Sequence, residues 1–101
     1  MGFGLGEKVR VKARIIPVKV YYREGGILRK WERREVGAEG VIAGVRTVQE
    51  GISEYRYEGR WIFEPRRYIK TYLIAVKLSE MWHVLPEDIE VIQGEITDES
   101  A

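Results

Sequence analysis

Residues 7 to 14 read Glu-Lys-Val-Arg-Val-Lys-Ala-Arg, with a cation at every second position and a small apolar residue between the cations. A period of two is the pattern of a half-buried β-strand, because successive side chains of a strand point to opposite faces of the sheet. The segment therefore predicts a strand that carries Val9, Val11 and Ala13 into a core. Its other face presents a basic stripe.

The chain has 101 residues and no cysteine. A domain of this size buries roughly two-thirds of the surface that its unfolded chain exposes, and it can be stable without disulfides. We expect a flexible N-terminus at 1–6, one domain at 7–93 and a disordered acidic tail at 94–101. No apolar run approaches the ~20 residues of a membrane span, so we expect a cytoplasmic protein without a membrane segment.

The formal net charge of +1 hides an uneven distribution. Residues 1–34 carry ten Lys and Arg against three Glu, whereas residues 80–101 carry seven Asp and Glu and no Lys or Arg. Such asymmetry marks a basic binding face with an acidic tail. The alternative is internal neutralisation, because the first and last strands of a small barrel usually lie close together.

Strand patterns continue along the first half of the chain. Ile15-Ile16-Pro17 interrupts the alternation and predicts a bulge or a strand end. Glu24-Gly25-Gly26 predicts a hairpin turn, because glycine accepts a positive φ. The segment from Ile27 to Val36 has both helix formers and strand formers; we favour the return arm of a hairpin with a short helix close behind it.

The second half contains further turn signals. We expect turns at 37–40 and 49–51, with a buried strand at 41–45 between them. Tyr55, Tyr57, Trp61 and Phe63 recur in period two around Glu58-Gly59 and predict an aromatic hairpin that Glu64-Pro65 ends. Strands are expected at 68–78 and 81–85, and Pro86-Glu87-Asp88 suits one 3₁₀ turn.

Four of these segments together resemble the SH3-like small β-barrels. They are Gly6-Glu-Lys-Val-Arg-Val-Lys12, the Gly37-Ala-Glu-Gly40 turn entering Val41-Ile42, Tyr72-Leu-Ile-Ala-Val76 and Leu85-Pro-Glu-Asp-Ile-Glu-Val-Ile92. The class includes KOW-type domains of translation and transcription proteins and many small bacterial and phage proteins. The resemblance implies an all-β fold: a single SH3-like small barrel with extended hairpin insertions and a short 3₁₀ turn before the last strand. Val36 stands where the KOW motif usually has lysine.

The residues that could carry chemistry have simpler structural explanations. His83 is the only histidine, and a lone histidine in an aromatic strand more often packs or hydrogen-bonds than acts as a base. Ser53 or Ser79 could be drawn into a triad with His83 and Asp88, but no Gly-x-Ser-x-Gly context supports it. The carboxylates at 87, 88 and 90 suit a 3₁₀ turn better than a cation site. We expect no catalytic residue, metal or cofactor.

Three clusters combine cations with aromatic rings and are the candidate partner-binding residues. Arg and Lys neutralise phosphates and exposed rings stack on unpaired bases, which suits RNA or single-stranded DNA. Aromatic and arginine side chains are equally typical of protein interfaces, and a small barrel can use them to cover its core. The candidates are Tyr22, Arg23, Arg29, Lys30, Trp31, Arg33, Arg34, Trp61, Arg66, Arg67, Tyr68 and Lys70.

These clusters lie on the expected hairpin arms. We expect a non-catalytic binding module, of a phage or mobile-element accessory type, that engages a protein partner or another copy of itself through the arms. The alternative is an SH3-like domain that binds RNA or single-stranded DNA. Trp31, Tyr22 and Tyr68 on one face with the arginines would favour nucleic acid, whereas aromatic contacts with a second copy would favour assembly.

Overall fold

The computed structural model describes residues 3–56, 59–77 and 79–92. Its elements are β1 (Lys8–Arg23), β2 (Gly26–Arg56), β3 (Arg60–Lys77), β4 (Glu80–Val84), the 3₁₀ turn η1 (Pro86–Asp88) and β5 (Ile89–Val91). All five strands belong to one sheet and pair antiparallel. The predicted all-β class is confirmed. Within the described ranges the only helical segment is η1, so nothing helical there has the length of a bilayer span.

The strand pairings run in a ring. β1 pairs with β2, β2 with β3 and β3 with β4, and β4 returns to β1 where Ile15 lies opposite His83. β5 pairs with the first residues of β1, at Val9–Val11, and places Arg10 opposite Glu90. The Lys12 ammonium also lies 3.7 Å from the Glu90 carboxylate. The acidic closing strand therefore lies beside the basic opening strand and neutralises part of its stripe.

The core lies where β1, β2, β3, β4 and β5 meet. In β1, buried Val9, Val11, Ala13 and Ile15 alternate with more exposed cations, so the predicted half-buried strand is confirmed. Phe3 packs edge-on against Tyr72 with ring centroids 5.3 Å apart, and it adds to this cluster from the N-terminal segment. The buried members of the core cluster are Val9, Val11, Ile42, Ile74, Val84 and Ile89.

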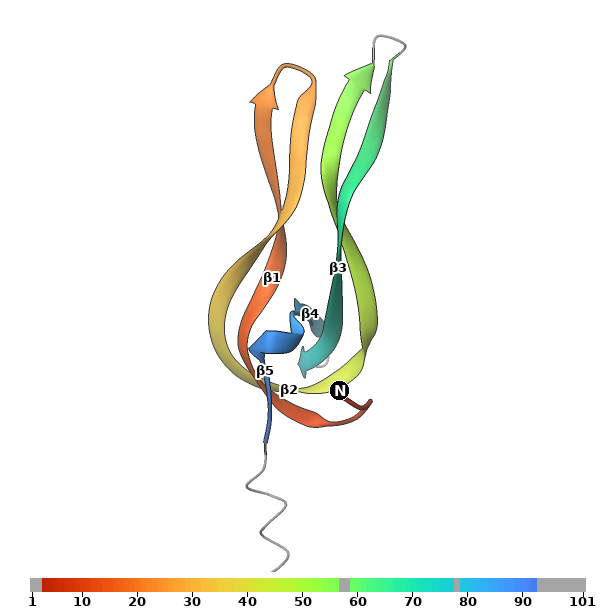
Figure 1. The fold of residues 1–101 in the computed structure, drawn as a ribbon. Coiled ribbons are helices and arrows are strands. Elements are labelled where there is room, and N and C mark those ends of the chain that lie inside the picture. Colours follow the sequence, from red (N-terminus) through yellow and green to blue (C-terminus); the bar gives the residue numbers. More distant parts are fainter. Residues whose placement is uncertain (1–2, 57–58, 78, 93–101) are drawn as a thin grey trace, which may run out of the picture.

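Two long hairpins project from this core (Figure 1). We call residues 16–35 arm 1, residues 49–70 arm 2, and residues 7–15, 36–48 and 71–92 the base. β2 runs down arm 1, crosses the base and continues up arm 2, so its two halves lie side by side between β1 and β3 (Figure 1). The Cα radius of gyration is 17.6 Å, against about 13 Å for a compact domain of this length.

β2 is longer than the sequence predicted. Turns were expected at 37–40 and 49–51, but the strand runs through both segments, so these predictions were wrong. At Gly40 the glycine serves a close approach instead: a Cβ there would lie 2.6 Å from Ile74 Cγ2 and 2.7 Å from the Ala75 carbonyl oxygen. At Glu50-Gly51 the register shifts as in a bulge. In sequence, a glycine needed for a close approach looks like a glycine needed for a turn.

Three further predictions, each of a place where a strand would be interrupted, were also wrong. Residues 27–36 form the return arm as favoured, but strand continues where the short helix was expected. At Ile15-Ile16-Pro17 the register is continuous, so neither the predicted bulge nor the predicted strand end occurs there. Pro65 does not end its strand either; Pro17 lies opposite Trp31 and Pro65 opposite Gly51. No described strand pairs with the outer edge of β1 or β3 at these prolines, so their missing N–H groups cost no hydrogen bond of the sheet.

Other local predictions are confirmed. Arm 1 turns at Glu24-Gly25, where Gly25 has a φ of +75°. Arm 2 is a hairpin in which Tyr55 lies opposite Trp61, although Tyr57 and Glu58 at its tip lie outside the described residues. The 3₁₀ turn and the closing strand occur where expected. The predicted tail at 94–101 also lies outside the described residues.

Candidate binding surface on the two arms

The two arms are held against each other by hydrogen bonds from the turn and the β2 half of arm 1 to the β2 half of arm 2. The Tyr55 amide donates to the Gly25 carbonyl oxygen at 2.8 Å. Lower down, the Trp31 amide donates to Glu50 Oε2 at 2.8 Å and the Trp31 indole Nε1–H donates to the Gln49 carbonyl oxygen at 3.1 Å. These bonds span most of the arms, so the surface between the arms is held in one geometry.

Arm 2 separates its aromatic residues from its carboxylates. Residues directly opposite in an antiparallel pair share a face, and alternate residues of one strand do so as well. The pairs of Tyr55 with Trp61, Ser53 with Phe63 and Gln49 with Tyr68 therefore lie on one face, which we call the aromatic face. All four rings are exposed by between 38% and 61%.

The opposite face of arm 2 carries Glu50, Glu54 and Glu64, of which Glu54 lies opposite Ile62. These three carboxylates form ion pairs with arginines. The pairs are Arg67 with Glu50, Arg56 and Arg23 with Glu54, and Arg66 with Glu64. Acidic side chains and their arginine partners thus gather away from the aromatic face.

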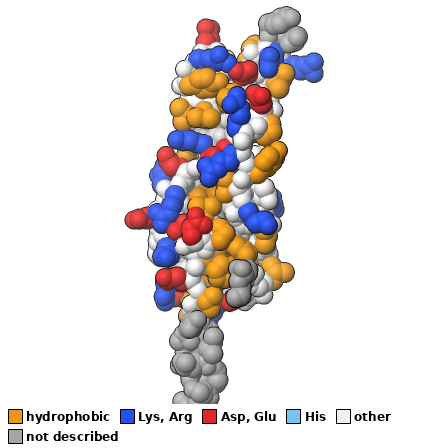
Figure 2. All heavy atoms as spheres, in the orientation of Figure 1, with side chains coloured by type: hydrophobic (Ala, Val, Ile, Leu, Met, Phe, Trp, Pro, Cys, Tyr) orange, Lys and Arg blue, Asp and Glu red, His pale blue; other side chains and the backbone are white. Residues whose placement is uncertain are grey.

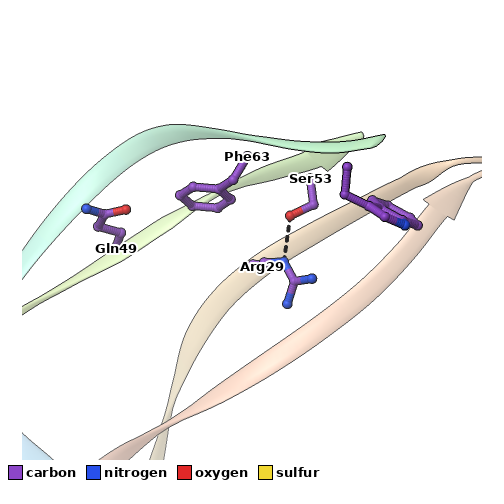
Figure 3. Close-up of a pocket in the computed structure, with 5 residues that line it drawn as sticks. Arg29, Gln49, Ser53 and Phe63 are labelled. Atoms are coloured by element: carbon purple, nitrogen blue, oxygen red, sulfur yellow. Dashed lines mark hydrogen bonds between the residues drawn. The ribbon is translucent and has the colours of Figure 1, made fainter. Parts of the chain in front are cut away.

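A groove opens between the arms. Its upper part is a cavity of about 440 Å³ lined by Arg29, Gln49, Ser53, Trp61 and Phe63. Figure 3 shows Arg29 of arm 1 and Ser53 of arm 2 joined across it, and the Arg29 Nε–H donates to Ser53 Oγ at 2.6 Å. Its lower part is a cavity of about 290 Å³ lined by Pro17, Val18, Lys19, Arg29, Lys30, Trp31 and Gln49. Because Arg29 and Gln49 line both cavities, we treat them as one inter-arm groove.

The groove is cationic and has no acidic lining residue. Lys19 and Arg29 lie directly opposite each other in the β1–β2 pairing and therefore share a face, whereas the next residue, Lys30, directs its side chain to the other face of arm 1. Among the described residues, no carboxylate forms an ion pair with any of the three. Their positive charges are therefore available to a partner.

The arginines predicted from sequence are placed differently. Five of them already have carboxylate partners: Arg23, Arg33, Arg34, Arg66 and Arg67. Four of the other predicted residues line the groove: Arg29, Lys30, Trp31 and Trp61. Tyr68 lies on the aromatic face. Lys70 lies two residues further along β3, opposite Thr47. Tyr22 lies apart from them near the turn of arm 1, under the guanidinium of Arg23.

Arg33 connects arm 1 to the base. Its Nε and Nη2 donate to the two carboxylate oxygens of Asp88, at 3.0 Å and 2.8 Å, and Asp88 is only 4% exposed. The hydrogen bond to Asp88 is the main reason that the pKa of Arg33 is raised. The pair joins residues 55 positions apart, so the carboxylate of η1 serves as a structural anchor for this arm.

His83 lies where the arms meet the base. The Thr71 hydroxyl donates to the Arg46 carbonyl oxygen at 2.8 Å, and its oxygen lies 3.4 Å from His83 Nδ1. The His83 ring packs on Trp31 with centroids 5.0 Å apart. Burial lowers the pKa of His83, and the nearby charges of Arg46 and Arg14 lower it further. These contacts give His83 the packing and hydrogen-bonding role expected from sequence.

The side chains of Ser53, His83 and Asp88, considered above as a possible catalytic triad, do not hydrogen-bond to one another. Ser53 bonds to Arg29, Asp88 to Arg33, and His83 contacts Thr71. In the described part of the chain there is also no cluster of three metal-ligating side chains.

Sequence reasoning missed Lys19, Gln49 and Ser53 as groove residues. Each is a single polar residue within a strand pattern, and only strand register brings them together. Nothing in the sequence pattern indicated that Lys19 pairs with Arg29.

Comparisons with protein-family models, with curated proteins and with solved structures find no match to this chain.

Proposed function

We propose that this protein is a non-catalytic binding module that holds an anionic macromolecule in the inter-arm groove, on a scaffold of the SH3-like barrel class. The ring of strand pairings and the 3₁₀ turn before the last strand support that scaffold. The arms are the insertions that distinguish it.

One observation carries the proposal: Lys19 and Arg29, which share a face of arm 1, and the adjacent Lys30 line a groove without a carboxylate in its lining, and none of the three has an acidic partner among the described residues. Cationic side chains held together repel one another, and an anion that binds between them relieves this repulsion. Six other arginines of the arms pair with carboxylates. Arg60 and Lys70 also form no ion pair among the described residues, so the groove differs by its cavity lining as well as by its unpaired charge. Figure 2 shows hydrophobic side chains on both arms with Lys and Arg among them, as suits a surface that is covered by a partner.

The test is binding of labelled heparin, a polyanion without bases, at about 50 mM and about 200 mM salt. We expect binding that weakens strongly with salt and is mostly lost in Lys19→Ala/Arg29→Ala/Lys30→Ala. The matched control, Lys8→Ala/Lys12→Ala/Lys77→Ala, removes the same charge from the base and should keep most of the affinity. Equal losses in the two variants would show that only net charge matters and would refute the groove.

Self-assembly through the aromatic residues is the competing function. Light scattering at several protein concentrations distinguishes it. Growth of the particle with concentration that Trp61→Ala abolishes would favour assembly over an anionic partner.

A further inference from the structure

We infer that the anionic macromolecule is a single-stranded nucleic acid whose unpaired bases stack on the aromatic face of arm 2 while its phosphates contact the cations of arm 1. This inference rests on the proposed function and names the partner of the same groove. It requires two kinds of contact surface within reach of one chain, and the groove provides both.

The stacking surface is built from rings that folding leaves exposed. Trp61 and Phe63 are 53% and 38% exposed and line the upper cavity together with Arg29. They are two residues apart on β3, so their Cα atoms lie roughly 7 Å apart along the strand. Each ring can therefore take a separate base. Tyr55 holds the Trp61 ring edge-on, with centroids 5.6 Å apart, so this ring is supported in place.

The phosphate-binding surface faces these rings across the groove. Arg29 reaches Ser53 through its Nε, which fixes its guanidinium and leaves its terminal nitrogens as donors. Lys19 lies opposite Arg29 and adds a second charge at the same level of arm 1. Arg29 and the neighbouring Ser53 and Gln49 provide hydrogen-bonding groups to base edges or sugar hydroxyls between the two surfaces.

Charge also restricts where the strand runs. Glu50, Glu54 and Glu64 lie on the face opposite the rings, where their carboxylates already occupy the neighbouring arginines, so that face offers a phosphate fewer unpaired cations than the groove does. A nucleic acid chain therefore gains most by lying with its bases toward arm 2 and its backbone toward arm 1. A duplex offers phosphates but keeps its base faces stacked inside the helix, so it cannot use the aromatic face.

The experiment compares four labelled ligands of equal length or charge: a mixed-sequence single-stranded oligonucleotide, an abasic oligonucleotide with the same number of phosphates, the duplex and polyglutamate. We expect the base-bearing single strand to bind about 10-fold or more tightly than the abasic strand or the duplex. The salt dependence, as the slope of log affinity against log salt, should fall by about 2 in Lys19→Ala/Arg29→Ala/Lys30→Ala.

Substitution of the rings provides the second measurement. Trp61→Ala and Phe63→Ala should each lower the affinity for the base-bearing strand about 10-fold, while the affinities for heparin and the abasic strand stay the same. Trp61→Leu keeps apolar bulk without a large ring and should behave like Trp61→Ala if stacking is the interaction. Ile62→Ala, on the opposite face of the same strand, is the control and should change nothing. Unfolding midpoints verify that each variant folds.

The outcomes separate this inference from the proposed function. Equal affinity for the abasic and base-bearing strands, with heparin still bound through the groove cations, would overturn base stacking and leave the anionic partner standing. Polyglutamate binding as tightly as the oligonucleotide would overturn nucleic acid in favour of an acidic protein. Failure of all these ligands to bind would refute the proposed function itself.

Discussion

The base and the arms are built from the same three long strands but from different side chains. The base has six Lys and Arg and six Asp and Glu, whereas the arms have eleven and seven. The core of the base is aliphatic and buried, but the large apolar side chains of the arms are mostly exposed, and most of those are aromatic. The base therefore uses its side chains for folding, and the arms keep apolar surface and charge that folding does not use.

The largest expected effect separates the stability of the two regions. Ile74 is fully buried in the base, so Ile74→Ala should lower the free energy of unfolding by about 2–5 kcal/mol through lost burial and a cavity. Ile62 is 43% exposed on arm 2, so Ile62→Ala should cost less than about 0.5 kcal/mol. Urea denaturation measures both changes. Equal losses would contradict the comparison.

A smaller effect is expected where arm 2 needs close packing. A Cβ at Gly51 would come closest to the Glu64 carbonyl oxygen, and it would also lie 2.8 Å from Phe63 Cζ and 2.9 Å from Pro65 Cα. Gly51→Ala should therefore cost about 1–3 kcal/mol by overpacking. Because Phe63 must move, the variant should also weaken binding in the groove. Gly37 has open space around it, and Gly37→Ala is the control. A Gly51→Ala protein with wild-type stability would show that arm 2 is loosely packed.

The anchor between arm 1 and the base should contribute less, because Arg33 is about half exposed and can turn toward Glu35, which lies 3.6 Å away. Asp88→Asn should lower the unfolding midpoint more than Glu35→Gln does, since Asp88 is buried and bonds twice to Arg33. Amide hydrogen exchange should then increase in arm 1 before the base. Uniform exchange in both regions would mean that the pair does not anchor the arm.

The smallest effect is a pH dependence at the junction. The pKa of His83 in the folded protein is lowered from its ordinary value of 6.5, so the unfolded chain binds a proton more readily than the folded one. The free energy of unfolding should therefore decrease as the pH falls below about 6.5. Once the pH is below the lowered pKa of His83 in the folded protein, this contribution no longer changes. Unfolding midpoints of wild type and His83→Gln between about pH 7.5 and pH 5 measure the difference. Identical curves would contradict this assignment.

Much of the fold could be predicted because its signals are local. Alternation in the opening strand identified Val9, Val11 and Ala13 as buried, and the glycines after Glu24 identified the first hairpin turn. Pro86 identified the 3₁₀ turn. The site was less predictable, because eight of the twelve candidate residues are cations whose availability depends on neighbours far away in sequence. Arg33 illustrates this, since its carboxylate partner is 55 residues distant.

By itself, therefore, the sequence determined the strand character, the faces of the opening strand and the presence of arginine and aromatic side chains on hairpins. Those properties depend on alternation and on backbone preferences that act within a few residues. Only the tertiary structure decided that β2 continues through its glycines and that five candidate arginines are paired. It also decided that Lys19, Arg29 and Lys30 have no carboxylate partner within the described ranges, and that Arg29 lines a cavity with Trp61 and Phe63. Those outcomes depend on register and on contacts between strands, which bring together residues that no local pattern connects.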